Sequence, residues 1–422
     1  MDAQTNIITI GERSYTVLKQ DQMPDGRSCH VFAIGSKGIP ASYGGFESFM
    51  DSLTAYRAAT SIVYHVARMA QDDCRFVYHN AVVYDVKVPE IGHAKAIYYD
   101  IEALKRAIAF CKRNAIQKPV FFIMTCRIGP VMGHFAKQIR ALGGRLIINP
   151  DGHEWARRKW SKPVRQYWKL SERLMVTKAD LLTCDSKNIE KYIHNVYAKY
   201  GLKTVYIPYG ADVVSKKSAG NFEPDRISTK YKRWLKQNGL SVNGYYLVVA
   251  RCVPENNFDI IVREFMASDT SKRLAIITTP NDKFLGELDR KYHYSADPRI
   301  CFLGSVYDRR LLMEIRSHAF AYIHGHEVGG TNPSLLEAMG STDVNMLFNV
   351  CFNEEVAEDS ALYWGKEEGS LRDLIHRADK MNAADRQALG TKAKKRISEA
   401  YAWKSVVRKY EDVFLGKVGG SS

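Results

Sequence analysis

The sequence lacks the features that mark a membrane-spanning, secreted or metal-binding chain. No continuous apolar run is long enough to cross a bilayer, and the opening residues MDAQTNIITIGERS contain no basic stretch followed by an apolar one. The eight cysteines are scattered singly, with no CxxC pair and no clustered histidines. We therefore expect a cytoplasmic protein with free thiols, and we expect neither disulfides nor a metal site.

The dinucleotide fingerprint GxGxxG is also missing. The first glycine-rich loop, GSKGIPASYGGFE, has a different spacing, and no acidic residue stands where a ribose partner is usual, which disfavours a nicotinamide enzyme. Zinc-finger, RNP-type and basic-zipper signatures are absent, so we expect no nucleic-acid partner. The formal net charge of +15 at pH 7 still favours a partner that carries negative charge.

What is present indicates an ordinary globular chain with more than one domain. Its 422 residues are 45% hydrophobic and 25% charged, and this length suggests two or three domains. Short runs rich in Val, Ile, Phe and Tyr alternate with helical patterns, which is typical of βα units around parallel sheets. A first series of strands is expected at residues 30–35, 61–66, 119–125, 145–150, 181–186 and 204–210, and a second at 245–251, 273–279, 299–304, 319–325 and 344–350.

The polar stretch that begins GADVVSKKSAG separates the two series of strands and predicts a domain boundary. We expect a first Rossmann-like domain at residues 29–210 and a second at 211–399. Residues 1–28 precede the first βα unit and are expected to form an added strand pair or a tail.

Two glycine-rich loops are candidates for anion binding. In the first domain Gly44 and Gly45 precede a predicted helix, whose free amides favour an anion, although a tight turn would also need glycine. In the second, Pro333 suits the first turn of a helix, so the groups just before it would lie at the positive helix end. These groups belong to Gly329, Gly330, Thr331 and Asn332.

Three more candidates follow from sheet edges and from an apolar helix. Arg251 and Asp151 each follow a predicted strand, where ligands bind in open parallel sheets. Instead of binding a ligand, Arg251 could form a surface ion pair and Asp151 could be a helix N-cap. Glu337 stands among apolar helix residues, where a carboxylate needs a polar partner.

Basic and aromatic residues alternate after Trp155, in WARRKWSKPVRQYWKL. This mixture suits the headgroup layer of an anionic membrane, so peripheral attachment to the inner face of the cell membrane is a hypothesis. The alternative is a solvated helix whose aromatic side chains pack inward.

The ordered motifs together resemble the GT-B glycosyltransferases of family GT4. They are IGSKGIPASYGGFE, NPDGHEW, ADLLTCDSKNI, YIPYGAD, VARCVPENN and HEVGGTNPSLLEAMG, and they span most of the chain. The resemblance is greatest to bacterial polysaccharide rhamnosyltransferases with a first domain of the DUF1972 type. It implies an α/β fold of two Rossmann-like domains that face each other across a donor cleft. It also implies a final helix, at about residues 400–417, that crosses back to the first domain.

The resemblance implies the transfer of a deoxyhexose, L-rhamnose from dTDP-rhamnose, to a lipid-diphosphate-linked sugar in capsule or cell-wall synthesis. No cofactor or metal ion is implied, and the reaction would retain the anomeric configuration. The donor would be bound by Gly44, Gly45, Arg251, Asn256, Gly329, Gly330, Thr331, Asn332 and Glu337, with Glu337 on the ribose. Asp151 would position the acceptor, or act as general base if the reaction inverts, and Tyr43, Glu47 and His153 are further acceptor-side candidates.

Two positions depart from the family pattern. Gly329 stands where the first of two glutamates seven residues apart is usual, with Glu327 nearby but out of register, and Asn256 stands where a diphosphate-binding lysine is usual. We therefore expect phosphate contacts from backbone amides and small polar groups. The alternatives are a GT-B sugar-nucleotide epimerase, a non-catalytic polyanion-binding protein and an inactive partner subunit of another transferase.

Overall fold

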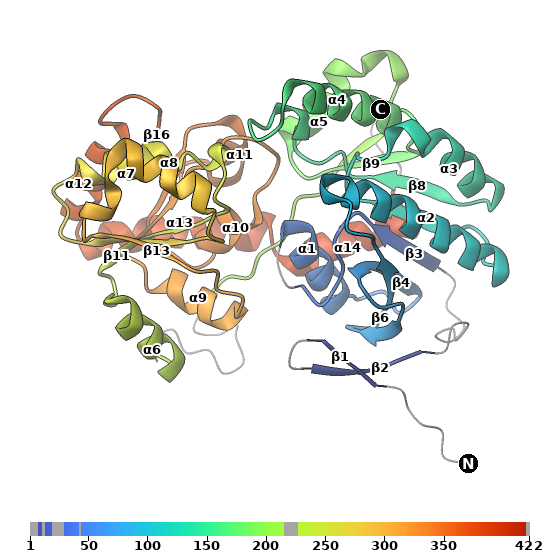
Figure 1. Ribbon diagram of the computed structural model, residues 1–422, viewed down its shortest axis with the longest axis horizontal. Helices are drawn as coiled ribbons and strands as arrows, with labels where there is room; N and C mark the ends of the chain where they lie inside the picture. Colours follow the sequence, from blue (N-terminus) through green and yellow to red (C-terminus); the bar gives the residue numbers. More distant parts are fainter. Residues whose placement is uncertain (1–6, 11–12, 19–28, 42–43, 215–226, 419–422) are drawn as a thin grey trace. The chain divides into compact units, whose positions relative to one another are not determined.

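The computed structural model describes residues 7–10, 13–18, 29–41, 44–214 and 227–418 of the chain. These residues form two compact units, each built around one large sheet (Figure 1). Unit 1 comprises Met1–Trp155, Lys162–Tyr209 and Trp403–Ser422, and unit 2 comprises Ala156–Ser161 and Gly210–Ala402.

The sheet of unit 1 has eight strands in the order β10-β9-β8-β7-β3-β4-β6-β5, all parallel to their neighbours except β5, which is antiparallel to β6. Its strands are β3 (Cys29–Ile34), β4 (Ile62–Ala70), β5 (Arg75–Tyr78), β6 (Ala81–Lys87), β7 (Val120–Ile123), β8 (Arg145–Ile148), β9 (Leu181–Cys184) and β10 (Thr204–Tyr206). Its helices are α1 (Gly45–Ala55), α2 (Lys95–Arg113), α3 (Gly129–Ala141), α4 (Lys162–Val176), α5 (Lys187–Val196) and α14 (Trp403–Phe414), with short turns η1 (Gly92–Ala94), η2 (Glu154–Ala156) and η3 (Ala198–Tyr200).

The central strands of this sheet are buried along almost their whole length. All four residues of β7 and the last five of β3 are buried, as expected for apolar runs in a parallel sheet with helices on both faces. The chain leaves β3 for β4 on one side and β7 for β8 on the other, so β3 and β7 are neighbours from which the chain departs in opposite directions. Loops diverge at such a switch point, which makes the carboxyl ends of β3 and β7 the expected ligand site of unit 1.

A two-stranded hairpin precedes this sheet. β1 (Ile7–Ile10) pairs antiparallel with β2 (Arg13–Thr16), and Val17 then bridges to Phe76 of β5. The Leu18 amide donates to the Arg75 carbonyl at 2.7 Å, and the Tyr15 ring lies 5.3 Å from that of Phe76. The hairpin is thus attached to the edge strand of unit 1.

The sheet of unit 2 has six parallel strands in the order β13-β12-β11-β14-β15-β16. Its strands are β11 (Tyr245–Val249), β12 (Arg273–Ile277), β13 (Ile300–Leu303), β14 (Ala321–His324), β15 (Asn345–Phe348) and β16 (Leu362–Trp364). Its helices are α6 (Thr229–Asn238), α7 (Phe258–Met266), α8 (Asp282–Tyr292), α9 (Arg309–Ser317), α10 (Pro333–Met339), α11 (Cys351–Ala357), α12 (Ser370–Lys380) and α13 (Ala383–Ala400), with turns η4 (Pro254–Asn256) and η5 (Tyr294–Ala296).

Alternation along β11 builds a core on each face of this sheet. Tyr246 belongs to the cluster with Phe258 and Phe265 of α7, whereas its neighbour Tyr245 belongs to the cluster with Ile315 of α9. Here β11 and β14 are neighbours, and the chain leaves them for β12 and β15 on opposite sides. The carboxyl ends of β11 and β14 are therefore the switch point of unit 2.

The last helix, α14, belongs to unit 1, as the resemblance implied (Figure 1). Glu411 accepts hydrogen bonds from the amides of Ala58 and Ala59 at 2.9 and 3.0 Å, and the rings of Tyr410 and Phe414 pack 5.6 and 5.5 Å from Phe122 of β7. These contacts join the end of the chain to the core of the first unit.

The largest difference between the observed and the predicted unit boundaries concerns one short segment. The main change between units falls at Tyr209 and Gly210, but Ala156–Ser161, which we expected in the first domain, belongs to unit 2. Sequence patterns did not indicate this, because the segment has no periodic apolar residues and is held by charged contacts described below.

Candidate functional site

The loop after β3 brings a carboxylate to the predicted glycines. Gly44 is the N-cap of α1 with a φ of 121°, and Gly45 is the first residue of this helix. Glu47 is buried in the first turn, and its Oε1 accepts a 2.6 Å hydrogen bond from the Lys37 amide. A Cβ atom on Gly44 would lie 1.9 Å from Glu47 Oε2. The acceptor-side candidate Tyr43 lies outside the described residues.

Glu47 changes which ligand this loop suits. A helix N-terminus attracts anions, but here a buried carboxylate already lies there and would repel a phosphate. Gly44 and Gly45 therefore fit a neutral, hydroxyl-bearing ligand better than the phosphate that we expected from their sequence.

The loop after β7 adds Arg127, which sequence analysis did not select. Its Nη1 lies 3.3 Å from Asp100 Oδ2 and donates to the Gly35 carbonyl at 3.1 Å. Burial lowers the pKa of Arg127, but the charges of Asp100, Asp151 and Glu154 outweigh this and hold it above its usual value. The guanidinium thus stays charged at the switch point of unit 1.

Asp151 follows β8 in a conformation that few residues adopt. Its φ is 61°, in the left-handed region, which costs energy for residues other than glycine but is tolerated best by Asn and Asp. Its amide donates to Asn149 Oδ1 at 2.8 Å, and its Oδ1 accepts from the next amide, Gly152, at 2.7 Å. The side chain therefore stabilises its own turn and is not the N-cap of a longer helix.

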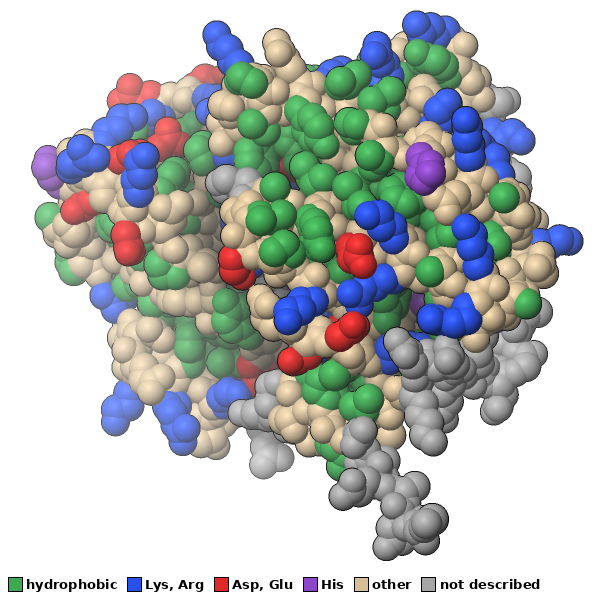
Figure 2. Space-filling view, turned by 45° about the vertical axis from the view of Figure 1, so that its right-hand side comes forward, with side chains coloured by type: hydrophobic (Ala, Val, Ile, Leu, Met, Phe, Trp, Pro, Cys, Tyr) green, Lys and Arg blue, Asp and Glu red, His purple; other side chains and the backbone are tan. Residues whose placement is uncertain are grey.

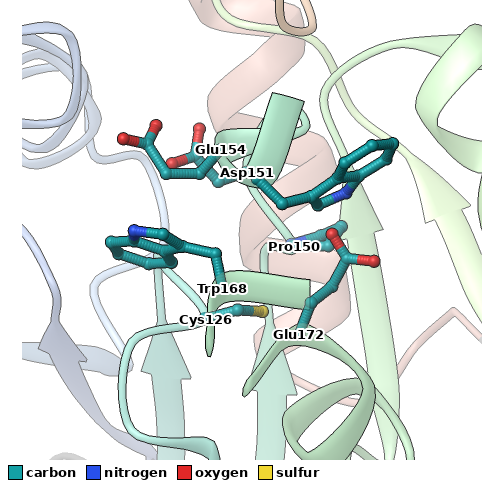
Figure 3. Close-up of a pocket in the computed structure, with 7 residues that line it drawn as sticks. Cys126, Pro150, Asp151, Glu154, Trp168 and Glu172 are labelled. Atoms are coloured by element: carbon teal, nitrogen blue, oxygen red, sulfur yellow. The ribbon is translucent and has the colours of Figure 1, made fainter. Parts of the chain in front are cut away.

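A small pocket surrounds Asp151. In Figure 3 the carboxylates of Asp151 and Glu154 point to the same side of the pocket, above the indole of Trp168. Glu172 enters from α4 on the other side, near Pro150. The remaining lining residues are Cys126 and Trp155. Carboxylates that accept hydrogen bonds beside flat aromatic rings suit a sugar ring with its hydroxyl groups.

Buried hydrogen bonds support one wall of this pocket. Glu172 Oε1 accepts from the hydroxyls of Tyr192 and Tyr197, both at 2.5 Å, and burial raises the pKa of this carboxyl. Lys169 Nζ lies 4.0 Å from the centroid of the Trp155 ring. Burial and the Lys169 charge lower the pKa of His153 to about 4, so its imidazole is neutral at pH 7. His153 can therefore donate or accept a hydrogen bond without adding charge.

In unit 2 the loops after β11 and β14 are tied together by Asn256. The Asn256 side chain is 6% exposed; its Nδ2 donates to the Arg251 carbonyl at 2.7 Å, and its Oδ1 lies 2.8 Å from His326 Nδ1. Arg251 itself is exposed. Asn256 therefore joins the two loops. Arg251, the one cation of the motif VARCVPENN, is exposed and could contact a ligand.

The loop after β14 contains the predicted glycine pair. Gly329 has a φ of 131°, a conformation that favours glycine, and Gly330 and the buried Thr331 follow it. Asn332 is the N-cap of α10, and its Oδ1 accepts from the Ser334 amide at 2.9 Å. The Asn332 oxygen is thus used in capping, and its amide nitrogen is the group that we consider as a donor to a ligand.

Glu337 has the polar partner that its apolar surroundings required. Its Oε2 lies 2.6 Å from Nη1 of Arg316, whose side chain is 5% exposed, whereas that of Glu337 is 35% exposed. Arg316 Nη2 also donates to Ser334 at 3.2 Å. The pair leaves part of the Glu337 carboxylate open to solvent, where it could accept a hydrogen bond from a hydroxyl group.

Removing the Glu337 carboxylate should lower the stability of the protein, because Arg316 is buried. We expect Glu337→Ala to lower the free energy of unfolding by about 2 kcal/mol, because Arg316 then keeps a buried charge without its partner. A double variant, Arg316→Met with Glu337→Leu, should recover most of this loss. Urea unfolding of the three proteins measures both effects, and a double variant less stable than Glu337→Ala would contradict this account.

The segment Ala156–Ser161 reaches both loops of the unit 2 switch point. Arg158 Nη2 lies 2.6 Å from Glu327 Oε1, and the Lys159 amide donates to Glu255 Oε1 at 3.0 Å. Arg157, between Ala156 and Arg158, is 8% exposed. Arg157 is therefore buried within unit 2 and Arg158 forms an ion pair there. Both belong to the cations that suggested a membrane surface, so this weakens the membrane hypothesis.

The face shown in Figure 2 gives the membrane hypothesis little support. On the face shown in Figure 2, Lys and Arg side chains lie scattered among acidic and apolar ones. Among the described helices, none combines the length and the apolar character that a bilayer crossing requires. All eight cysteines are free thiols.

Sequence reasoning missed several residues of these sites. Arg127 lies two residues beyond the predicted strand 119–125, so the rule that ligands bind at strand ends would have found it. Glu154 and Trp168 required knowledge of the pocket, and Arg157 and His326 required knowledge of which segments pack together. Glu154 and His326 belong to motifs of the family resemblance, and Arg157 and Trp168 belong to the basic and aromatic stretch, but no pattern assigned any of the four to a nucleotide or sugar site.

His324, at the end of β14, should make unit 2 sensitive to acid. It is 3% exposed, and burial lowers its pKa to about 3. In the unfolded chain the His324 imidazole binds a proton near pH 6.5, whereas in the folded chain it does not. The contribution of neutral His324 to the unfolding free energy is therefore complete above pH 6.5 and is lost as the pH falls towards 3. Between pH 7 and 5 the wild type should lose about 2 kcal/mol more unfolding free energy than His324→Phe. Denaturant titrations at the two pH values measure this, and equal losses would contradict it.

Comparison with known proteins agrees with this architecture. Residues 28–212 match the DUF1972 family, a domain of unknown function, which confirms the first-domain type that we expected. No curated protein matches the sequence significantly.

Solved structures match over almost the whole chain. Sucrose-phosphate synthase from Thermosynechococcus elongatus aligns with a TM-score of 0.73 at 14% identity, covering 93% of this chain and 99% of that one. Anabaena HepE in complex with UDP and glucose aligns with a TM-score of 0.65 at 12% identity, and trehalose-6-phosphate from E. coli bound with UDP-2-fluoro glucose with 0.66 at 15%. Each covers 93% of this chain and 100% of its own. The chain therefore has the GT-B fold.

Proposed function

We propose that this chain is a glycosyltransferase that takes its sugar from a nucleotide diphosphate. The observation that carries the proposal is the end-to-end match with GT-B structures, two of which were solved with UDP or a UDP-sugar derivative. The candidate residues support it, because in each unit they lie in loops or helices that follow strands at or beside the switch point of the sheet, where ligands bind in α/β proteins.

Unit 2 suits the donor. Arg251, the amides of Gly330 and Thr331 and the amide nitrogen of Asn332 offer hydrogen-bond donors to a diphosphate, and Glu337 offers an acceptor to a ribose hydroxyl. Such groups stabilise the charge that develops on the leaving diphosphate. We expect no cofactor and no metal ion to be needed.

Unit 1 suits the acceptor. Asp151, Glu154 and Glu172 present carboxylates beside Trp168, and Glu47 and the neutral His153 add polar groups on the same unit. We propose that the acceptor is a sugar, part of a lipid-diphosphate-linked intermediate. The motif resemblance suggests L-rhamnose from dTDP-rhamnose as donor, GT4 membership, and a role in capsule or cell-wall polysaccharide synthesis.

In this reaction the bond between the anomeric carbon and the diphosphate oxygen breaks, and the acceptor oxygen bonds to that carbon. In the retaining course that we favour, the proton of the acceptor hydroxyl goes to the departing phosphate, and Asp151 orients the hydroxyl. In an inverting course Asp151 takes the proton instead.

Donor binding can be tested by measuring the melting temperature of the protein with dTDP, UDP and their sugar derivatives. Sugar transfer can be tested by assaying the same donors with a synthetic lipid-diphosphate-linked sugar as acceptor. We expect stabilisation by at least one nucleotide diphosphate and a product extended by one sugar. A sugar altered without an acceptor would indicate an epimerase instead. If no nucleotide binds and a nucleic acid does, the chain is a polyanion-binding protein.

A further inference from the structure

Asn256 stands where the family resemblance implies a diphosphate-binding lysine, so this position contributes no positive charge. Asn256 uses both its amide atoms within the protein, so only Arg251 among the residues of that loop is available to neutralise a diphosphate. We propose that Arg157 supplies the second diphosphate-binding cation, an assignment that rests on the proposed function.

The backbone around Arg157 is held at the site by its two neighbours. Arg158 binds Glu327 of the loop after β14, and the Lys159 amide binds Glu255 of the loop after β11. These loops follow adjacent strands at the switch point of unit 2. Arg157, buried next to both contacts, is therefore fixed where the two loops meet.

His326 connects this guanidinium with that of Arg251. Burial, followed by the charges of Arg157, His324 and Arg251, holds the pKa of His326 well below its usual value. Both arginines are thus electrostatic neighbours of one neutral imidazole, which is hydrogen-bonded to Asn256 at 2.8 Å. A neutral imidazole adds no charge of its own beside these two cations, so the local positive charge comes from the arginines.

The charges of the whole cluster match a diphosphate. Glu327, 8% exposed, also binds Lys366 at 2.7 Å. Four cations and two carboxylates leave a formal excess of two positive charges, the complement of the two negative charges of a sugar-linked diphosphate. The cluster consists of Arg157, Arg158, Arg251, Lys366, Glu255 and Glu327. A surplus of charge in a partly buried site favours an anionic ligand.

The ordinary alternative is that Arg157 only balances the charge of Glu255, which is fully buried. The two roles differ in the ligand that they affect. If Arg157 binds the diphosphate, its replacement weakens the binding of UDP or dTDP more than that of the corresponding monophosphate. If Arg157 is only structural, its replacement weakens the binding of both nucleotides equally and lowers the melting temperature of the protein.

Calorimetric titration of Arg157→Gln and Arg157→Lys with UDP, dTDP, UMP, dTMP and pyrophosphate tests the proposal, with melting temperatures measured on the same proteins. We expect Arg157→Gln to weaken diphosphate binding by about 10- to 100-fold, with a smaller loss for the monophosphates, and Arg157→Lys to lie between it and the wild type. The matched control is Lys159→Gln, since this exposed side chain lies over the Trp160 ring, 4.7 Å from its centroid. It should change affinity by less than about threefold.

The outcomes separate the two claims. If the wild type binds a nucleoside diphosphate and Arg157→Gln and Arg157→Lys bind it equally well, the role of Arg157 is overturned and the proposed function stands. Equal losses for monophosphate and diphosphate also overturn it, in favour of the structural role. If the wild type binds none of the five probes, the proposed function fails together with this inference.

Discussion

Replacing Asp151 by Asn should lower the kcat of sugar transfer by about two orders of magnitude, with donor affinity unchanged. Asn tolerates the left-handed backbone that Asp151 adopts and keeps one oxygen to accept the Gly152 amide, so the turn should survive. What is lost is the charge that holds the acceptor hydroxyl, and misplacing a reacting group by about 1 Å costs about 10²-fold in rate. Steady-state kinetics with saturating donor measures the effect.

Glu154→Gln is the matched control, because it removes the same charge from the same pocket. We expect it to cost less than about tenfold, since Glu154 would bind the acceptor without touching the reacting hydroxyl. Equal losses for the two variants would show that only the total charge of the pocket matters. An Asp151→Asn variant at full rate would remove Asp151 from the mechanism. A loss above about 10³-fold with an inverted product anomer would identify Asp151 as the general base.

Gly325→Ala should destabilise unit 2 and abolish measurable donor binding. Gly325 follows β14, and a Cβ atom there would lie 2.2 Å from the carbonyl oxygen of Asn256 and 2.9 Å from Ile261 Cδ1. The first neighbour is backbone, so the loops after β11 and β14 must separate. Such overpacking costs about 1 to 3 kcal/mol, or roughly 2 to 12 °C in melting temperature for a unit of this size.

The donor-binding loss has the same cause, because the contact of Asn256 with Gly325 sets the spacing of the loops that carry Arg251 and the glycine pair. Gly286→Ala is the control: no atom lies within 4 Å of a Cβ at this position of α8, and alanine is the better helix former, so stability should stay or rise by up to about 1 kcal/mol. Scanning calorimetry and UDP titration of both variants decide the matter. Normal UDP binding by Gly325→Ala would contradict the role assigned to this close approach.

The positions of some candidate residues could be predicted because local pattern and topology coincide. Arg251 and Asp151 follow apolar runs that were recognisable as parallel strands, and ligands bind at the carboxyl ends of such strands. The need of Glu337 for a polar partner was also predictable from its apolar neighbours. The identity of that partner, Arg316 on a different helix, was not, since no local pattern relates the two positions.

Other predictions changed once the contacts were known. The glycines before α1 predicted a phosphate, yet Glu47, which sequence analysis placed on the acceptor side, lies close enough to Gly44 to repel one. Asn256 stood in the place of a cation and proved to be a bridge between two loops. In both cases the residue type was known, but its partners depended on side chains that meet only after folding.

By itself the sequence determined the two series of βα units, the division near residue 210 and the loops that follow the strands, because burial imposes a period on neighbouring residues that can be recognised without knowing the fold. Only the tertiary structure decided the strand order that makes β11 and β14 neighbours, and the membership of Ala156–Ser161 in unit 2. Our proposal that Arg157 supplies the cation missing at the Asn256 position also rests on tertiary contacts. The physical reason is that these features depend on hydrogen bonds and ion pairs between segments about 100 or more residues apart. Examples are the Lys159 amide with Glu255 and Arg158 with Glu327, and no local period records such contacts.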